Sequence, residues 1–349
     1  MSKRNHAVNN CHPDARFWPK DLPEYVAFDC CVAALIRGFS PKCRDGAAKH
    51  ESSREMLRPK EGLRMTVWRT RSRSTGLKSK TNLINLRHQL RRVRTIVVKV
   101  GTKVLMQPDG SVATDVLKEL VKSVATLRMS GRRVLLVTSG AIGIGAKRLS
   151  VSPGMVPVCA AAGQSALTAL YHVEFGNLGI AAAQVLVTDE DFTEPERHRR
   201  LCDTLNYLTR LGVVPIINEN HLATHSPDAK MDDRVFSEND MLASLVASAT
   251  RADLLVLLTD VDGVYTEHPT EAQAALISEI AGTGQEIGLN EQVSELGRGG
   301  IRAKLLAAAH AIESTRLFAV IANGRTPEVL EQIVRGQQIG TLIAPAEVQ

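Results

Sequence analysis

Short apolar runs alternate with longer amphipathic stretches from Thr95 to the end of the chain. The short runs predict strands, and the stretches with helical spacing predict helices. The predicted strands are 96–100, 134–137, 181–187, 213–217, 254–258 and 318–321, and the predicted helices are 112–129, 160–170, 197–211, 240–249, 301–311 and 327–334. Because strands alternate with helices, the pattern predicts an α/β fold with a mainly parallel sheet and helices on both faces.

The first 94 residues lack this pattern and differ in charge. They hold 21 Lys and Arg against 8 Asp and Glu, whereas residues 95–349 hold 22 against 29, so the formal net charge of +6 hides two unlike parts. We expect a basic, disordered extension over 1–94 and a folded domain over 95–349. The stretch 65–94 also has the composition of a transit peptide, and 82–90 could form a short amphipathic helix. Nucleic-acid binding by this extension is a further alternative, but no aromatic interleaving or known module supports it, and we expect none.

Cysteine usage and hydropathy limit the compartment. The six cysteines have no metal-ligand or paired spacing, and no apolar run reaches the length of a membrane span. These features favour reduced thiols in a cytoplasmic protein without a membrane partner, or a mitochondrial protein if translation starts near Met65.

Polar side chains follow two of the predicted strands. The run 254–258 leads into Thr259, Asp260 and an Asp-Gly pair, and Lys99 lies in the strand that ends just before Gly101. Open parallel sheets bind ligands outside the carboxyl ends of their strands, so Thr259 and Asp260 are candidate site residues. Lys99, beside a glycine turn, is a candidate for binding a phosphate. The structural alternatives are an Asp-Gly turn and a lysine that extends from the strand end to water.

Three further segments could contact a ligand. The glycine-rich stretch 139–145 opens a helix and could hold an anion, but its spacing is wrong for a dinucleotide fingerprint, and a simple strand-to-helix turn is the alternative. Asn239 and Asp240 precede an apolar helix and could be N-caps or could position a substrate. The loop 297–304 could hold a triphosphate or be an ordinary surface loop, and the chain has no P-loop motif.

Taken in order, these motifs resemble the amino acid kinase family, and within it the glutamate 5-kinases. The resemblance covers about residues 95–345 and is carried by segments 98–102, 137–142, 161–164, 216–220, 239–240, 258–265, 299–304, 320–324 and 340–342. It implies an amino acid kinase-like open αβα sandwich with a mainly parallel sheet of about eight strands. It also implies transfer of a phosphoryl group from MgATP to the γ-carboxylate of L-glutamate, giving L-glutamyl 5-phosphate in the first step of proline biosynthesis.

The resemblance also implies roles for individual residues. Lys99 and Lys304 would neutralise the transferring phosphoryl group, and Asp240 would orient them. Glutamate would be held by Gly101, Ser139, Gly140 and Asn239. ATP would be held by Lys99, Thr259, Asp260, Arg298, Gly299, Gly300 and Lys304, with Mg²⁺ held mainly by the ATP phosphates. A carboxylate is already a nucleophile, so no general base is needed.

The sequence departs from the family pattern in several places. His221 replaces the usual Asp, and we hypothesise that Asp228, Asp232 or Asp233 in the following loop supplies the missing charge. Arg298 and Ala303 stand where threonines are common, and we expect no C-terminal RNA-binding-like domain. The family further implies a homo-oligomer, dimer or tetramer, and feedback inhibition by proline. The alternatives are an acetylglutamate or carbamate kinase and a non-catalytic regulatory homologue.

Overall fold

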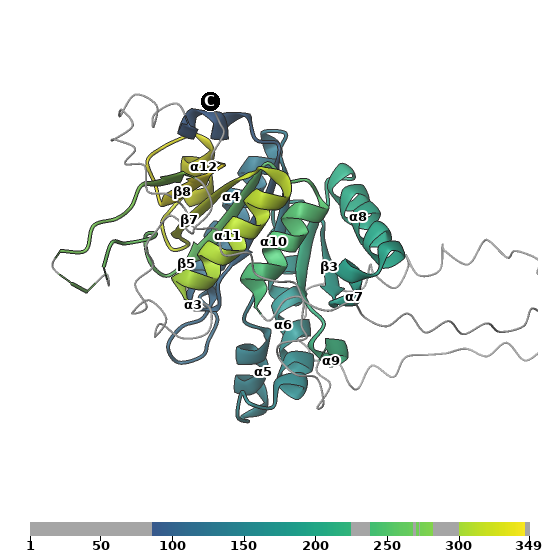
Figure 1. Ribbon diagram of the computed structural model, residues 1–349. Helices are drawn as coiled ribbons and strands as arrows, with labels where there is room; N and C mark the ends of the chain where they lie inside the picture. The colour runs from purple at the N-terminus through teal and green to yellow at the C-terminus, as the bar shows by residue number, and fades with distance from the viewer. Residues whose placement is uncertain (1–85, 225–237, 268–269, 272, 282–299, 346–349) are drawn as a thin grey trace, which may run out of the picture. The chain divides into compact units, whose positions relative to one another are not determined.

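The computed structural model describes residues 86–224, 238–267, 270–271, 273–281 and 300–345, all of which belong to the part of the chain from Arg73 onward. The expected disorder of residues 1–85 therefore lies outside the described residues. Within the described part, the architecture is a single sheet between two layers of helices (Figure 1).

The sheet has eight strands in the order β3-β4-β2-β1-β5-β7-β8-β6. All neighbouring pairs are parallel except β7 and β8, which run antiparallel. The mainly parallel, eight-stranded α/β fold is thus confirmed. The strands are Thr95–Val100 (β1), Arg133–Val137 (β2), Ala182–Val187 (β3), Val214–Glu219 (β4), Leu254–Thr259 (β5), Glu279–Ala281 (β6), Phe318–Asn323 (β7) and Thr341–Ala344 (β8).

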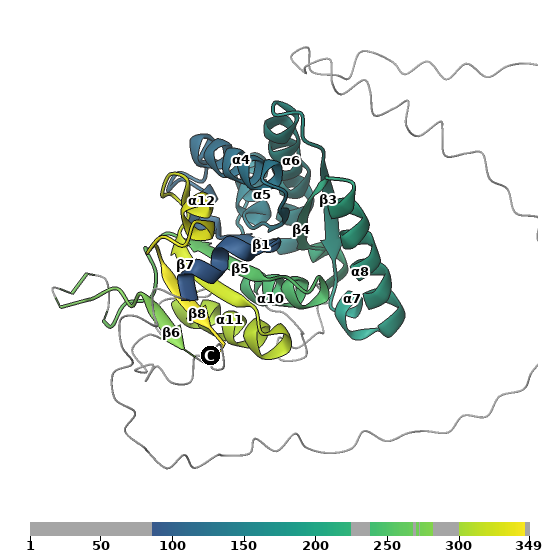
Figure 2. The same cartoon turned by 90° about the horizontal axis from the view of Figure 1, so that it is seen from above.

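Helices cover both faces of the sheet, as Figure 2 shows from above. One face carries α4, α6 and α12, and the other carries α8, α10 and α11. The described helices are Thr102–Leu105 (α3), Thr114–Met129 (α4), Ala141–Leu149 (α5), Val156–Gly176 (α6), Glu190–Thr193 (α7), Pro195–Arg210 (α8), His221–Thr224 (α9), Asn239–Ala249 (α10), Ile301–Thr315 (α11) and Val329–Val334 (α12), with a 3-10 turn at Leu90–Arg92 (η3).

Strand β1 is buried along its whole length, and its two faces serve different layers. Ile96, Val98 and Val100 pack in the core beneath α4, α6 and α12, whereas Val97 packs in the core beneath α10 and α11. Successive side chains of a strand point to opposite faces, so Lys99 shares the face of Val97. The alternation therefore directs Lys99 toward α10 and α11.

Two differences from the expected elements matter for the site. Strand β4 continues through Asn218 and Glu219, which we expected to follow the strand rather than to lie in it. Strand β6 was not predicted, because three residues are too few to show a period of two, and pairing with β8 holds it in the sheet.

The packed unit begins before the strand at which we expected the domain to start. Residues 86–92 are helical or 3-10, and Leu90 is fully buried. Arg87 is 4% exposed and pairs with Glu279 at 3.2 Å. Its two terminal nitrogens donate to four backbone carbonyls at 2.6 to 3.0 Å, those of Ser278, Gln337, Ile339 and Gly340. This arginine clamp attaches the segment before β1 to the β6–β8 edge of the sheet.

Candidate active site

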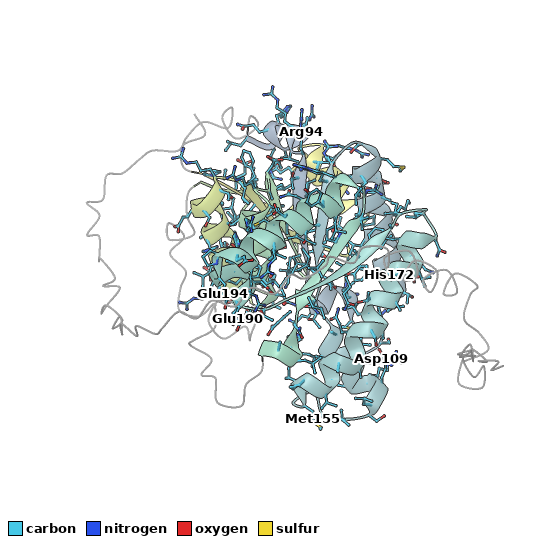
Figure 3. All side chains as sticks on the ribbon, turned by 90° about the vertical axis from the view of Figure 1, so that its right-hand side faces the viewer. Arg94, Asp109, Met155, His172, Glu190 and Glu194 are labelled. Carbon is cyan, nitrogen blue, oxygen red and sulfur yellow. The ribbon has the colours of Figure 1, made fainter. Side chains whose placement is uncertain are left out.

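The candidate residues gather past the carboxyl ends of the parallel strands. Arg94, directly before β1, lies at one end of the domain in Figure 3, and Asp109 and Met155 lie at the opposite end. The strand ends that carry Lys99, Ser139, Asn218 and Thr259 come from the four neighbouring strands β1, β2, β4 and β5. This is the edge at which open α/β sheets bind ligands.

Three charged side chains that the sequence singled out meet in one buried cluster. The Nζ of Lys99 lies 2.8 Å from Oδ1 of Asp240, and the Nζ of Lys304 lies 3.2 Å from Oδ2 of the same carboxylate. Lys99, Asp240 and Lys304 are 6%, 1% and 4% exposed. Strand β1, the first turn of α10 and the first turn of α11 supply one residue each. The structure thus brings together residues that lie far apart in the sequence.

These three side chains carry two positive charges and one negative, and Glu238 adds a further negative charge that acts on Lys99. Burial lowers the pKa of Lys99; Asp240 opposes this shift, and the nearby Lys304 adds to it. Buried ammonium groups are costly unless anions surround them, so two lysines at one place mark a site suited to anions. The arrangement can therefore neutralise charge on an anionic ligand such as a phosphoryl group.

Capping does not explain Asn239 and Asp240. The N-cap of α10 is Glu238, and it makes no side-chain cap hydrogen bond, while Asn239 and Asp240 are the first two helical residues. A carboxylate in the first turn is favoured by the helix dipole, which helps to place Asp240 between the two lysines.

A neutral hydrogen-bond network adjoins the cluster through Asn239. Its Nδ2 lies 2.9 Å from the carbonyl of Thr138, 3.0 Å from Oγ of Ser139 and 3.2 Å from Oδ1 of Asn218. Asn218 in turn donates to Oε1 of Gln164 at 2.8 Å. The network fixes amide and hydroxyl dipoles before any ligand arrives, which suits the binding of a polar head group.

Asn218 and Gln164 were not among the predicted site residues. Both belong to motifs that carried the family resemblance, at 161–164 and 216–220, and that was the available signal. Both are almost fully buried, and Asn218 accepts from Asn239 while it donates to Gln164, so the pair holds Asn239 in place.

Backbone conformation favours glycine at Gly140, and close packing favours it at Gly101. Gly140 is the N-cap of α5 and has a φ of 103°, a conformation that favours glycine. A Cβ on Gly101 would lie 3.0 Å from the carbonyl oxygen of Leu258 and 3.9 Å from Nζ of Lys99. The Gly101 amide donates to that same carbonyl at 3.2 Å, so Gly101 closes the end of β1 onto β5 beside the lysine.

Gly145 of the stretch 139–145 and Gly163 on α6 serve helix packing. A Cβ on Gly145 would lie 1.7 Å from the carbonyl oxygen of Cys159, and one on Gly163 would lie 1.8 Å from that of Ala141. Helices α5 and α6 therefore touch backbone to backbone at these two positions. Gly145 therefore has a packing role, whereas the predicted anion site concerns the start of the helix at Gly140 and stays a prediction.

Thr259 and Asp260 end β5 on the other side of Lys99. Thr259 is buried and donates to Oδ1 of Asp260 at 3.2 Å, and the exposed Lys103 lies 3.5 Å from Oδ2. Partial burial raises the pKa of Asp260, but a backbone hydrogen bond and Lys103 outweigh it, so the pKa is lowered. Gly300 is the N-cap of α11, four residues before Lys304, whereas Arg298 and Gly299 lie outside the described residues.

Thr341 holds the segment that follows β5. Its Oγ1 accepts from the amide of Val264 at 2.8 Å and donates to the carbonyl of Ile277 at 2.6 Å. A Cβ on Gly263 would come within 2.6 Å of that hydroxyl. The Asp-Gly pair after β5 therefore packs against the Gly340–Thr341 motif, and the Thr341 hydroxyl joins the two segments. The sequence did not indicate this structural role.

His221 lies beside a buried carboxylate. Its Nδ1 is 3.4 Å from Oε2 of Glu219, the last residue of β4, and both side chains are largely buried. Asp228, Asp232 and Asp233, which we proposed as replacements for the usual Asp, lie outside the described residues. Glu219 is therefore a second source of negative charge at this position, one that the hypothesis did not include.

Membrane-spanning helices and clusters of metal ligands are both missing from the described residues. No helix among them is long and apolar enough to cross a membrane. Nor do they bring three or more His, Cys, Asp or Glu side chains together in a group that could hold a metal ion. Cys159 and Cys202, the cysteines that the structure describes, are free thiols.

Comparison with known proteins identifies the class. Residues 94–323 match the amino acid kinase family, and the chain belongs to that family, which confirms the prediction from the motifs. A carbamate kinase from Giardia lamblia bound to AMP-PNP has the same fold, with a TM-score of 0.55 and 18% identity over 73% of this chain and 99% of that one.

Relatives with higher sequence identity include proteins named for reactions of glutamate. A glutamate 5-kinase from Listeria monocytogenes serotype 4b (strain CLIP80459) is 36% identical over 267 residues, covering 74% of this chain and 96% of the relative. A delta-1-pyrroline-5-carboxylate synthase 2 from Oryza sativa subsp. japonica is 37% identical over 279 residues, which is 75% of this chain. The match spans only 38% of the rice protein's length.

Proposed function

We propose that this protein is a kinase that transfers the γ-phosphoryl group of ATP to the γ-carboxylate of L-glutamate. The observation that carries the proposal is the buried Lys99–Asp240–Lys304 cluster beside the neutral network around Asn239. The similarity over nearly the whole length of a protein named glutamate 5-kinase supports glutamate as the acceptor.

The chemistry requires little beyond positioning and charge neutralisation. A γ-carboxylate oxygen attacks the γ-phosphorus, forming a new P–O bond, while the bond to the β,γ-bridging oxygen breaks and ADP leaves. The products are L-glutamyl 5-phosphate and ADP, and no proton needs to be removed from the nucleophile. Lys99 and Lys304 would stabilise the charge that spreads over the transferring group.

The two ligands would lie on either side of this cluster. Glutamate would contact Ser139, Gly140 and Asn239 near Gly101, and ATP would contact Thr259, Asp260 and Gly300, with Arg298 and Gly299 in the preceding loop. Mg²⁺ would arrive with ATP and be held mainly by phosphate oxygens, as this ion usually is in kinases. We further propose a place in proline biosynthesis, feedback inhibition by proline and a homo-oligomeric state.

The test is an assay of the full-length chain with ATP, Mg²⁺ and hydroxylamine, which traps an acyl phosphate as a hydroxamate. L-Glutamate, N-acetyl-L-glutamate and carbamate would each be offered as acceptor. The proposal expects ADP release with L-glutamate, and hydroxamate that forms with L-glutamate and is lost in Lys304→Ala. ADP release or hydroxamate formation mainly with another acceptor would assign the protein to a different branch of the family. A folded protein that binds ATP but turns over none of the three would contradict catalysis.

A further inference from the structure

Helix α6 contributes two buried polar side chains to the neutral network. Gln164 and Thr168 lie one helical turn apart and are 8% and 7% exposed. Nε2 of Gln164 donates to Oγ1 of Thr168 at 3.3 Å, and Oε1 of Gln164 accepts from Nδ2 of Asn218 at 2.8 Å. Oδ1 of Asn218 then accepts from Nδ2 of Asn239 at 3.2 Å. We call this series of three amides and one hydroxyl the amide relay.

The amide relay joins the two helical layers of the domain. It begins on α6, which packs on one face of the sheet, passes the carboxyl end of β4 and ends on α10, which packs on the other face (Figure 2). Thr168, Gln164 and Asn218 are buried, whereas Asn239 is partly exposed. A ligand can therefore reach the relay at Asn239.

The direction of the hydrogen bonds in the relay is set at Asn239. A backbone carbonyl can only accept, so the Asn239 atom 2.9 Å from the Thr138 carbonyl must be Nδ2. The Asn218 atom that faces this amino group must then be Oδ1, which turns Nδ2 of Asn218 toward Gln164. The same logic assigns Oε1 and Nε2 of Gln164 and leaves the Thr168 hydroxyl to accept. The chemistry of the partners thus determines the orientation of each amide.

This orientation leaves Oδ1 of Asn239 for a ligand. Nδ2 of Asn239 donates to three acceptors, while no described residue donates to Oδ1. Asn239 is partly exposed, and Oδ1 is not one of the buried side-chain atoms of the described residues that lack a partner. An amide oxygen accepts a hydrogen bond but cannot donate one. Asn239 therefore offers an acceptor to the ligand, and the group that it recognises must be a donor.

We propose that Gln164 is a positioning residue that makes Asn239 recognise the ammonium group of the phosphoryl acceptor. The inference rests on the proposed function, in which the acceptor is L-glutamate. With both carboxylates ionised, the ammonium group is the one hydrogen-bond donor of L-glutamate, so it is the group that Oδ1 of Asn239 selects. His221 replaces the Asp that the family pattern places near this group, so the ammonium needs another acceptor.

Gln164 acts through the acceptor that it gives to Asn218. Without that acceptor, Nδ2 of Asn218 is a buried donor that lacks a partner, which is costly. Oδ1 of Asn239 can satisfy this donor if the Asn239 amide turns inward, and the turn withdraws the oxygen from the ligand. Loss of Gln164 should therefore weaken the binding of an acceptor that has an ammonium group and spare one that lacks it.

The test is calorimetric titration of the full-length protein with L-glutamate and, separately, with glutarate, which lacks the ammonium group, in Mg²⁺ and saturating AMP-PNP. Gln164→Met removes the acceptor at similar volume. Gln164→Glu keeps an oxygen that accepts from Asn218 in either protonation state. Ser165→Ala, at the next position of α6 and exposed, is the matched control. The affinity of each variant for AMP-PNP reports whether the site is folded.

The wild type and Ser165→Ala should bind L-glutamate about tenfold or more tightly than glutarate. Gln164→Met should lose about tenfold in affinity for L-glutamate, while its affinities for glutarate and AMP-PNP stay within about threefold of the wild type. Gln164→Glu should recover most of the affinity for L-glutamate.

Three results would overturn the proposal: wild-type protein that does not prefer L-glutamate to glutarate, equal losses for both acceptors in Gln164→Met, or Gln164→Glu as weak as Gln164→Met. The first comparison uses the wild type alone and does not depend on the folding of a variant. Because binding is measured without turnover, the inference is separable from the proposed function. A wild type that prefers L-glutamate but forms no hydroxamate would contradict the kinase reaction and leave the role of Gln164 standing.

Discussion

The two halves of the candidate active site differ in charge, although both lie at the carboxyl ends of the parallel strands. On the β1 side, Lys99, Asp240 and Lys304 form a buried ionic cluster that holds two ammonium groups. On the β2–β4 side, Asn239 and Asn218 belong to a buried network with no net charge. Charge is concentrated where a phosphoryl group would move, and fixed dipoles stand where a substrate would only be held.

Removing Asp240 should have the largest effect, because it breaks the ionic half outright. Asp240→Ala removes the carboxylate that both buried lysines contact, which should cost about 3–5 kcal/mol of unfolding free energy. Urea denaturation followed by circular dichroism measures this loss. Asp115→Ala, on the exposed side of α4, is the control. Equal stability of the two variants would mean that the lysines do not depend on the carboxylate.

Removing Lys304 should damage catalysis more than stability. Lys304→Ala takes away one of two cations on the transferring group, so kcat/KM should fall by about 10²–10³. The hydroxamate assay measures this, with Lys122→Ala on the surface of α4 as the control for a lost lysine. Activity within twofold of the wild type would exclude Lys304 from the phosphoryl-binding role.

Disrupting the neutral half should give a smaller and different defect. Asn239→Ala removes one donor from Ser139 and Asn218, so we expect the KM for glutamate to rise by about tenfold or more, with a lesser change in the KM for ATP. Initial rates with each substrate varied in turn measure both constants. An equal rise in both would show that the two halves do not divide the ligands as proposed.

The smallest expected effect concerns the pH dependence of the reaction. It is confined to the alkaline limb of the pH–rate profile and is small at neutral pH. Burial lowers the pKa of Lys99 below its ordinary value of 10.5, so its neutral form appears at a lower pH than that of a free lysine. Because the proposed mechanism needs the charged form, kcat/KM should fall as pH rises through that lowered pKa.

Lys99→Arg provides the comparison, since a guanidinium stays charged well above this range. Its alkaline limb should move to higher pH, even if its activity at neutral pH is lower. Coincident limbs in the wild type and the variant would assign the titration to another group.

The sequence marked the ionic half of the site and, in the neutral half, Ser139 and Asn239, but not the pair that supports them. A lysine within an otherwise apolar strand is costly to bury, and this cost marks Lys99 as unusual in the sequence alone. Asn218 and Gln164 form a side-chain pair across 54 residues, and local pattern carries no sign of such a pair. The same holds for Thr341, whose hydroxyl joins segments that lie far apart in the chain.

The central strands and long helices were predicted better than the short strand β6 and the segment that precedes β1. Continuous apolar runs indicated the central strands, and regular helical spacing indicated the long helices. The three-residue β6 and the segment 86–94 depend instead on tertiary contacts. The glycines of 139–145 illustrate a further limit, because turn formation and close helix packing favour the same residue.

The arginine clamp sets a limit on where a mature form of this protein can begin. If a protease or an internal start site removed the chain through Arg87, the carbonyls of Ser278, Gln337, Ile339 and Gly340 would lose their donor. Each carbonyl left without a protein or water donor would lower the free energy of unfolding by about 1–3 kcal/mol. Together these losses would destabilise the pairing of β6 with β8. A polypeptide starting at Met65 would keep the clamp, so any processing that preserves the fold must cut upstream of Arg87.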